Sequence, residues 1–168
     1  AAVSAPYPWL GTTWQRLLST RSSPAQALLL AGPRGVGKGV LAQAWARALL
    51  CEAPLPEGEA CGVCPACHWF QQHNHPDFRE LLPESMGEDE AGADEPVDLD
   101  AKDKKKSREI KIEQVRDIAD FMTLSTHRDG FRVLMVHPAE AMNLPAANAL
   151  LKTLEEPPPY AIFILATT

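Results

Sequence analysis

The chain has 168 residues, a formal net charge of −6 and a sequence pI near 5.3. This length suits one domain with a sizeable hydrophobic core. The acidic balance argues against a stand-alone DNA- or RNA-binding protein, which would need a basic surface. No apolar run approaches the roughly 20 residues of a membrane span, and the first residues lack the pattern of a secretory signal peptide. We therefore expect a cytoplasmic protein with no membrane partner.

Hydrophobic periodicity predicts an alternation of strands and helices. Apolar runs predict strands at 27–31, 78–82, 131–136 and 161–166. Three- and four-residue spacing predicts helices at 37–50, 112–124 and, after a capping Asn143, through Leu154. The expected buried faces comprise Val40, Leu41, Ala44 and Ala48 in the first helix and Leu144, Ala147, Leu150, Leu151 and Leu154 in the last. Continuous apolar runs suit parallel strands buried on both faces, so we expect a three-layer α/β fold.

A phosphate-binding loop follows the first strand. Residues 32–39 read Gly-Pro-Arg-Gly-Val-Gly-Lys-Gly and open a helix. In the pattern G-x-x-x-x-G-K-[ST], backbone N–H groups and the lysine hold phosphates, and the hydroxyl binds Mg²⁺. The candidate cofactor-binding residues are Gly32, Gly35, Gly37 and Lys38. Because Gly39 replaces the hydroxyl, two readings of this degenerate loop stay open: a relic that binds nothing tightly, or residual binding of phosphate, ATP or ADP.

The strand at 131–136 carries a second departure from a nucleotide hydrolase. It should end in carboxylates that hold Mg²⁺ and polarise water, but it ends in His137 and Pro138. No nucleophilic Ser or Cys motif accompanies His137, so we expect no catalytic residues and no catalytic activity of this chain's own. The missing hydroxyl at Gly39 and the missing carboxylates after the strand at 131–136 together indicate a nucleotide-binding fold used for something other than hydrolysis.

All four cysteines lie within seventeen residues, at Cys51, Cys61, Cys64 and Cys67. Two consecutive C-x-x-C spacings in a cytosolic chain indicate a metal site more than a disulfide framework. Four thiolates close a tetrahedron and leave no open position, so we expect structural zinc in a module at 51–67. The alternative is four free thiols. Three nearby histidines are expected to be surface groups: His68, His73 and His75.

The segment at 84–109 interrupts the alternation. It carries ten acidic and five basic residues and has no aromatic residue. This composition buries too little apolar surface to order the chain, so it predicts a solvated, disordered loop.

Several motifs together carry a family resemblance. Residues 148–157 read Asn-Ala-Leu-Leu-Lys-Thr-Leu-Glu-Glu-Pro, after a strand in the Walker B position. The cysteine module with His75-Pro-Asp77 follows the phosphate-loop helix, and the last strand ends in Thr167 and Thr168. In this order the motifs resemble the bacterial clamp-loader AAA+ subunits of DNA polymerase III, including their zinc module and sensor 1 segment.

The resemblance implies a P-loop, AAA+-type nucleotide-binding fold. With Gly39 and His137 in place of Mg²⁺ ligands, it implies the non-hydrolysing branch, a stator that helps load the sliding clamp onto primed DNA in replication. The implied partners are the delta and tau/gamma subunits, with DNA contacted only through the assembled complex. It also implies that residues 1–168 are the N-terminal part of such a domain, without the family's arginine finger, lid and fifth strand, and that the strand at 27–31 lies at a sheet edge.

Two alternatives remain. The first is an active clamp-loader ATPase of the tau/gamma kind, which Gly39 and His137 disfavour. The second is a zinc-dependent nucleic-acid-binding module, which the acidic charge disfavours.

Overall fold

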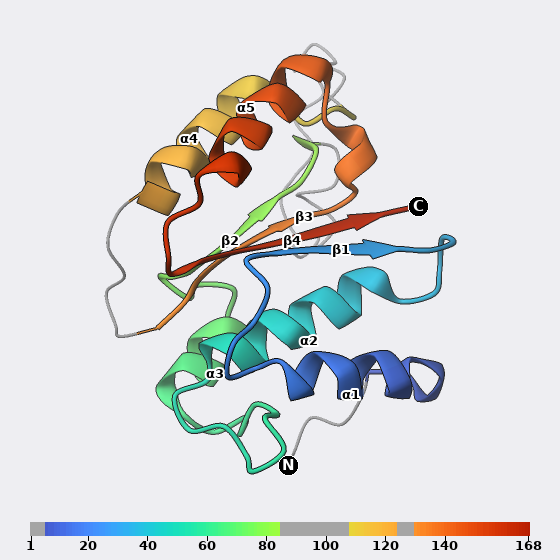
Figure 1. The fold of residues 1–168 in the computed structure, drawn as a ribbon, viewed down its shortest axis with the longest axis vertical. Coiled ribbons are helices and arrows are strands. Elements are labelled where there is room, and N and C mark those ends of the chain that lie inside the picture. Colours follow the sequence, from blue (N-terminus) through green and yellow to red (C-terminus); the bar gives the residue numbers. More distant parts are fainter. Residues whose placement is uncertain (1–5, 85–107, 124–129) are drawn as a thin grey trace, which may run out of the picture.

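Four parallel strands form a single sheet at the centre of the molecule (Figure 1). The computed structural model describes residues 6–84, 108–123 and 130–168. The strands are β1 (Ala27–Ala31), β2 (Phe78–Leu81), β3 (Arg132–Val136) and β4 (Ala161–Thr167), in the spatial order β1-β4-β3-β2. Every neighbouring pair is parallel, which confirms the predicted α/β class.

Burial of the strands follows their place in the sheet. All five residues of β3 are buried, since β3 lies between β2 and β4. Among the described residues β1 pairs only with β4, and its Leu29 is 61% exposed. The predicted edge position of this strand is therefore confirmed. A further strand beside it stays a prediction.

One face of the sheet is covered by α1 (Gly11–Ser19), α2 (Lys38–Leu50) and α3 (Pro65–Gln71), with a short 3-10 turn η1 (Pro8–Leu10) before α1 (Figure 1). The buried rings of Trp14 and Trp45 meet edge to face with centroids 6.5 Å apart, joining α1 to α2. Helix α2 in turn packs on β3 and β4. The sheet, α2 and α1 thus share one hydrophobic core.

The opposite face is covered by α4 (Ile112–Thr123) and α5 (Leu144–Glu155), with the 3-10 turn η3 (Ala139–Ala141) preceding α5 (Figure 1). Asn143 caps α5 as predicted: its side-chain oxygen accepts a hydrogen bond from the Ala146 N–H at 3.0 Å. Phe163 of β4 lies in the core between these helices and the sheet and is fully buried. None of the described helices is both long and apolar enough to cross a bilayer.

Two predicted helix faces are partly wrong. Leu41 and Ala48 are buried, but Val40 is 46% exposed, because it faces the cavity described below and not the sheet. Leu150 is buried, yet Leu144 and Leu151 of the same helix are 74% and 53% exposed. Helix α5 is apolar around most of its circumference, so its sequence does not reveal which side packs on the sheet.

The predicted loop at 84–109 lies almost entirely outside the described residues, which cover only its ends. Glu84, at the start of this segment, and Lys111, two residues after its end, form an ion pair with a nitrogen–oxygen distance of 3.6 Å, and about half of each side chain is exposed.

Candidate phosphate loop and metal centre

A cavity of about 510 Å³ opens at the carboxyl ends of β1, β3 and β4. This is the edge of a parallel sheet where ligands usually bind, because the strands there deliver their following loops to one place. Its polar side chains come from three separate segments: Arg34, Lys38, His137, Glu140, Thr167 and Thr168. The fold therefore gathers the phosphate-loop sequence, the end of β3 and the end of β4 around one hollow.

Two predicted loop glycines adopt conformations that favour glycine. Gly35 has φ 80° and Gly37 has φ 97°. Gly37 is also sterically required, since a Cβ built there would lie 2.6 Å from the ring of Tyr7. Next to Tyr7, the stacked Trp9 donates an indole N–H to the Val36 carbonyl at 2.9 Å. The aromatic pair before α1 thus holds the phosphate loop in place. This contact was not predicted from the sequence.

Lys38 is turned onto its own loop. Its ammonium donates hydrogen bonds to the carbonyls of Gly32 at 2.6 Å and Pro33 at 2.8 Å. The candidate residues Gly32, Gly35, Gly37 and Lys38 are therefore brought together, but the lysine is bonded to backbone carbonyls. An anion entering the cavity would have to compete for it.

Gly39 and His137, from two distant motifs, meet inside the cavity. A Cβ built on Gly39 would lie 3.4 Å from Nε2 of His137. Burial, helped by the positive charge of Lys38 and opposed by Glu140, lowers the pKa of His137 below its usual value. Its Nδ1 is buried and has no hydrogen-bond partner among the described residues. A neutral imidazole thus fills the space beside the helix start where the usual loop would present a hydroxyl.

Glu140 of η3 ties this edge together. Its two carboxylate oxygens accept hydrogen bonds from the hydroxyls of Thr167 at 2.8 Å and Thr168 at 3.0 Å. Burial raises the pKa of Glu140, but hydrogen bonds from its own backbone and from Thr167 and Thr168 outweigh that effect and hold the pKa below its usual value. This contact could not be predicted from the sequence, since Thr167 and Thr168 lie 27 and 28 residues after Glu140 and no motif links them.

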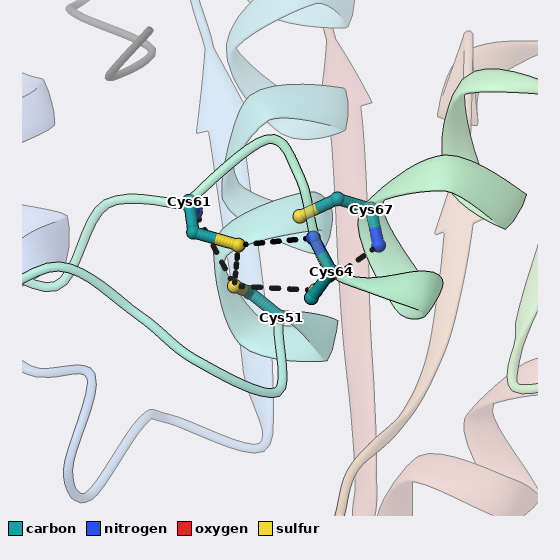
Figure 2. Close-up of side chains that lie close together, drawn as sticks. All are labelled: Cys51, Cys61, Cys64 and Cys67. Carbon is teal, nitrogen blue, oxygen red and sulfur yellow. Dashed lines mark hydrogen bonds between the residues drawn. The ribbon is translucent and has the colours of Figure 1, made fainter.

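The four cysteines converge at the end of α2, away from the phosphate loop. Figure 2 shows the side chains of Cys51, Cys61, Cys64 and Cys67 pointing at one another. All four sulfur atoms lie within 4.8 Å of one another. The sulfur of Cys51 is 3.6 Å from that of Cys61 and 3.8 Å from that of Cys64. A tetrahedron with Zn–S bonds of about 2.3 Å has sulfur–sulfur edges of roughly 3.8 Å, so the donor set fits zinc.

Local backbone structure explains this convergence. Cys51 is the C-terminal cap of α2, and Cys64 is the N-terminal cap of α3, accepting a bond from the Cys67 N–H at 3.4 Å. Backbone N–H groups of Cys61 and Cys64 point at the sulfurs of Cys51 and Cys61, each at 3.3 Å. Such donors stabilise thiolates, and two helix ends fix where the cysteines lie.

The thiols differ in how readily they ionise. Hydrogen bonds from the backbone, led by that of Val63, lower the pKa of Cys61 to about 6. Burial raises the pKa of Cys51 to about 12 and also raises the pKa of Cys67. Buried thiols crowded together resist carrying charge without a cation, and a bound metal ion would supply one.

The expectation that His75 is a surface group is wrong, although His68 and His73 are exposed as expected. His75 is only 3% exposed, and its Nδ1 accepts a hydrogen bond from the Asp77 N–H at 3.0 Å. The Asp77 carboxylate pairs with buried Arg132 at 3.1 Å. His75 thus anchors the loop before β2 and is absent from the cysteine cluster.

Comparison with known proteins identifies the family. A family model described as "DNA polymerase III, delta subunit" matches residues 12–168. DNA polymerase III subunit delta-prime of Pseudomonas aeruginosa is 40% identical over 159 residues, covering 95% of this chain. The Escherichia coli subunit delta-prime is 33% identical over 163 residues, covering 96%. The chain therefore belongs to this DNA polymerase III subunit family, and the resemblance predicted from its motifs is confirmed by these subunit delta-prime relatives.

Similarity extends to a related subunit and, at the level of the fold, to a solved structure. Subunit tau of Bacillus subtilis is 33% identical over 144 residues, covering 86% of this chain and 21% of that protein. The fold resembles a DNA polymerase III gamma subunit-related protein from Thermotoga maritima, with a TM-score of 0.56 and 24% identity, over 93% of this chain and 38% of the other. The chain spans 42% of the length of the two delta-prime subunits.

Proposed function

We propose that this chain is part of a non-hydrolysing clamp-loader subunit of the DNA polymerase III holoenzyme, a stator that helps load the sliding clamp onto primed DNA. The observation that carries the proposal is the meeting of Gly39 with His137. At the two positions where an AAA+-type site would carry Mg²⁺ ligands, this cavity has Gly39, which has no side chain beyond a hydrogen atom, and the neutral imidazole of His137. Neither can polarise a water molecule or neutralise a developing phosphate charge as a metal ion does.

The loop and its helix retain features that attract anions. Backbone N–H groups at the start of α2 and the cation of Lys38 lie at the cavity. Weak phosphate binding without turnover is therefore compatible with the proposal. An active ATPase of the tau/gamma kind is the rival, supported by the tau relatives of 32–33% identity.

The cysteine centre would hold one structural zinc ion through Cys51, Cys61, Cys64 and Cys67. The metal would tie the end of α2 to α3, and its four sulfur ligands would leave no position for a substrate. Nucleic-acid binding by this module is not favoured, because the chain is acidic overall.

The partners we infer are the delta and tau/gamma subunits, with DNA reached through the assembled complex in the cytoplasm. Clamp loading on primed DNA by a reconstituted complex tests the proposal. Omitting the protein that carries this chain should stop loading, whereas its Lys38→Ala variant should load normally. If Lys38→Ala stops loading while the variant remains folded and assembled, this chain's loop acts on nucleotide and the stator assignment fails.

A further inference from the structure

A short segment before α1, residues 7–10, packs along the phosphate loop, and we call it the strap. At one end Leu10 is buried in the core that α1 and α2 share with the sheet. At the other end the ring of Tyr7 lies on the α-carbon of Gly37 and stacks on Trp9, with centroids 4.7 Å apart and planes 6° apart. The strap is therefore anchored in the core and contacts the loop through its two rings.

Trp9 fixes the direction of one peptide group in the loop. Its indole N–H donates a hydrogen bond to the Val36 carbonyl at 2.9 Å. The Val36–Gly37 peptide is trans, so its N–H points opposite to its C=O and away from Trp9. Gly37 lines the cavity, whereas Tyr7 and Trp9 do not. The contact with Trp9 therefore turns the Gly37 N–H toward the cavity.

Donors at the cavity remain available for a ligand. The Gly37 N–H has no acceptor among the described residues. The ammonium of Lys38 has three N–H donors, and two of them bind the carbonyls of Gly32 and Pro33. The third donor and the Gly37 N–H can be satisfied together by the oxygens of one phosphate group, which accept hydrogen bonds from both kinds of donor.

We propose that Tyr7 and Trp9 are positioning residues of the phosphate loop, which hold the Val36–Gly37 peptide so that the cavity binds a phosphate group without Mg²⁺. No Mg²⁺ is invoked because Gly39 and His137 stand where its ligands would be. The inference rests on the proposed function, which allows phosphate binding without turnover. It adds two residues that lie outside the loop motif.

The exposure of Trp9 separates this role from a purely structural one. Trp9 is 62% exposed, so changing it removes little core packing. Its indole N–H bonds to the loop and to no other described segment. A change at Trp9 should therefore act on the loop and leave the sheet intact.

Inorganic pyrophosphate is the probe, and its affinity for the purified protein is measured by calorimetry in buffer without Mg²⁺. Trp9→Phe keeps an aromatic ring for the stack but loses the N–H donor, so it should bind pyrophosphate about 3–10-fold more weakly. Tyr7→Leu removes the ring that packs on Gly37 and should also weaken binding. In both variants hydrogen exchange should become faster at the amides of residues 35–38 and stay unchanged in β3.

Two further variants complete the experiment. Trp69→Phe makes the same change on α3, at the other end of α2, and should leave the affinity unchanged. Lys38→Ala should abolish binding, which places the probe at the loop.

Unchanged affinity and exchange in Trp9→Phe and Tyr7→Leu would overturn the inference. Faster exchange throughout the sheet, or binding that survives Lys38→Ala, would also overturn it. A parent protein that does not bind pyrophosphate would overturn the inference but leave the stator assignment intact, because a stator needs no bound nucleotide.

Discussion

The imidazole of His137 lies against the α-carbon of Gly39, so that a Cβ at position 39 would come within 3.4 Å of Nε2. The two residues are 98 positions apart in the sequence. Both depart from the motifs of an ATPase, and they fit each other in space. The absence of a side chain at position 39 therefore leaves room for the imidazole at the end of β3.

This contact predicts a coupling that can be measured. Gly39→Ala should be nearly neutral, because its Cβ only reaches contact distance. Gly39→Val adds two methyl groups against the imidazole and should lower the free energy of unfolding by about 1–3 kcal/mol. In a His137→Ala background the same valine should cost less, with a coupling of at least about 0.5 kcal/mol in urea unfolding. Additive effects would show that the two side chains do not compete for space.

The buried pair of Asp77 and Arg132 predicts a large loss of stability. Asp77→Ala leaves the guanidinium of Arg132, which is 1% exposed, without its carboxylate. Removing one partner of such a pair costs about 3–5 kcal/mol. Asp77→Asn keeps an oxygen acceptor and should cost less. Denaturant unfolding of both variants checks this, and an Asp77→Ala loss below 1 kcal/mol would contradict the role given to the pair.

His75 predicts a pH dependence of stability. Burial lowers its pKa below the usual 6.5, so the unfolded chain binds this proton more readily than the folded chain. Between these two pKa values the free energy of unfolding falls as pH falls, by up to about 1.4 kcal/mol per pH unit. His75→Asn retains an acceptor for the Asp77 N–H and should lose this slope. Exposed His68→Asn is the control, and a slope unchanged by His75→Asn would contradict the prediction.

The metal centre predicts a local change on metal removal. The segment from Glu52 to Cys64 has no helix or strand, and its small core consists of the cysteines and Ala60. With zinc bound, this segment should resist proteolysis, whereas Cys64→Ser or a chelator should expose it to cleavage. The sheet should keep its stability, because its two cores lack these cysteines. Equal cleavage with and without metal would argue against a structural ion.

The elements that could be predicted from the sequence are those marked by a pattern within a short stretch of chain, such as an apolar run or closely spaced cysteines. Continuous apolar runs placed β1 and β3 correctly, although only β3 is buried along its whole length and most of β1 is exposed or half-buried. The four cysteines were also predicted correctly to lie together, because they are close in the sequence and no distant contact is needed to bring them together. Helix α1 was not predicted, although Trp14, Leu17 and Leu18 have helical spacing.

The contacts that escaped prediction join distant parts of the chain. Asp77 and Arg132 are 55 residues apart, so an arginine inside an apolar run gave no indication of its partner. The exposed Leu144 and Leu151 could not be distinguished from core leucines by sequence, because the periodicity of a largely apolar helix does not indicate which face packs on the sheet. Long-range pairing and the choice of packed face are properties of the tertiary structure.

Steady-state ATP turnover by the purified chain, with Mg²⁺ and saturating nucleotide, shows whether the cavity can hydrolyse ATP. With Gly39 and His137 at the cavity, we predict a rate no higher than that of the Lys38→Ala variant, whether or not nucleotide binds weakly. A Mg²⁺-dependent rate on the order of 1 s⁻¹, in the ordinary range for enzymes, that disappears in Lys38→Ala would identify an active ATPase and rule out the stator assignment.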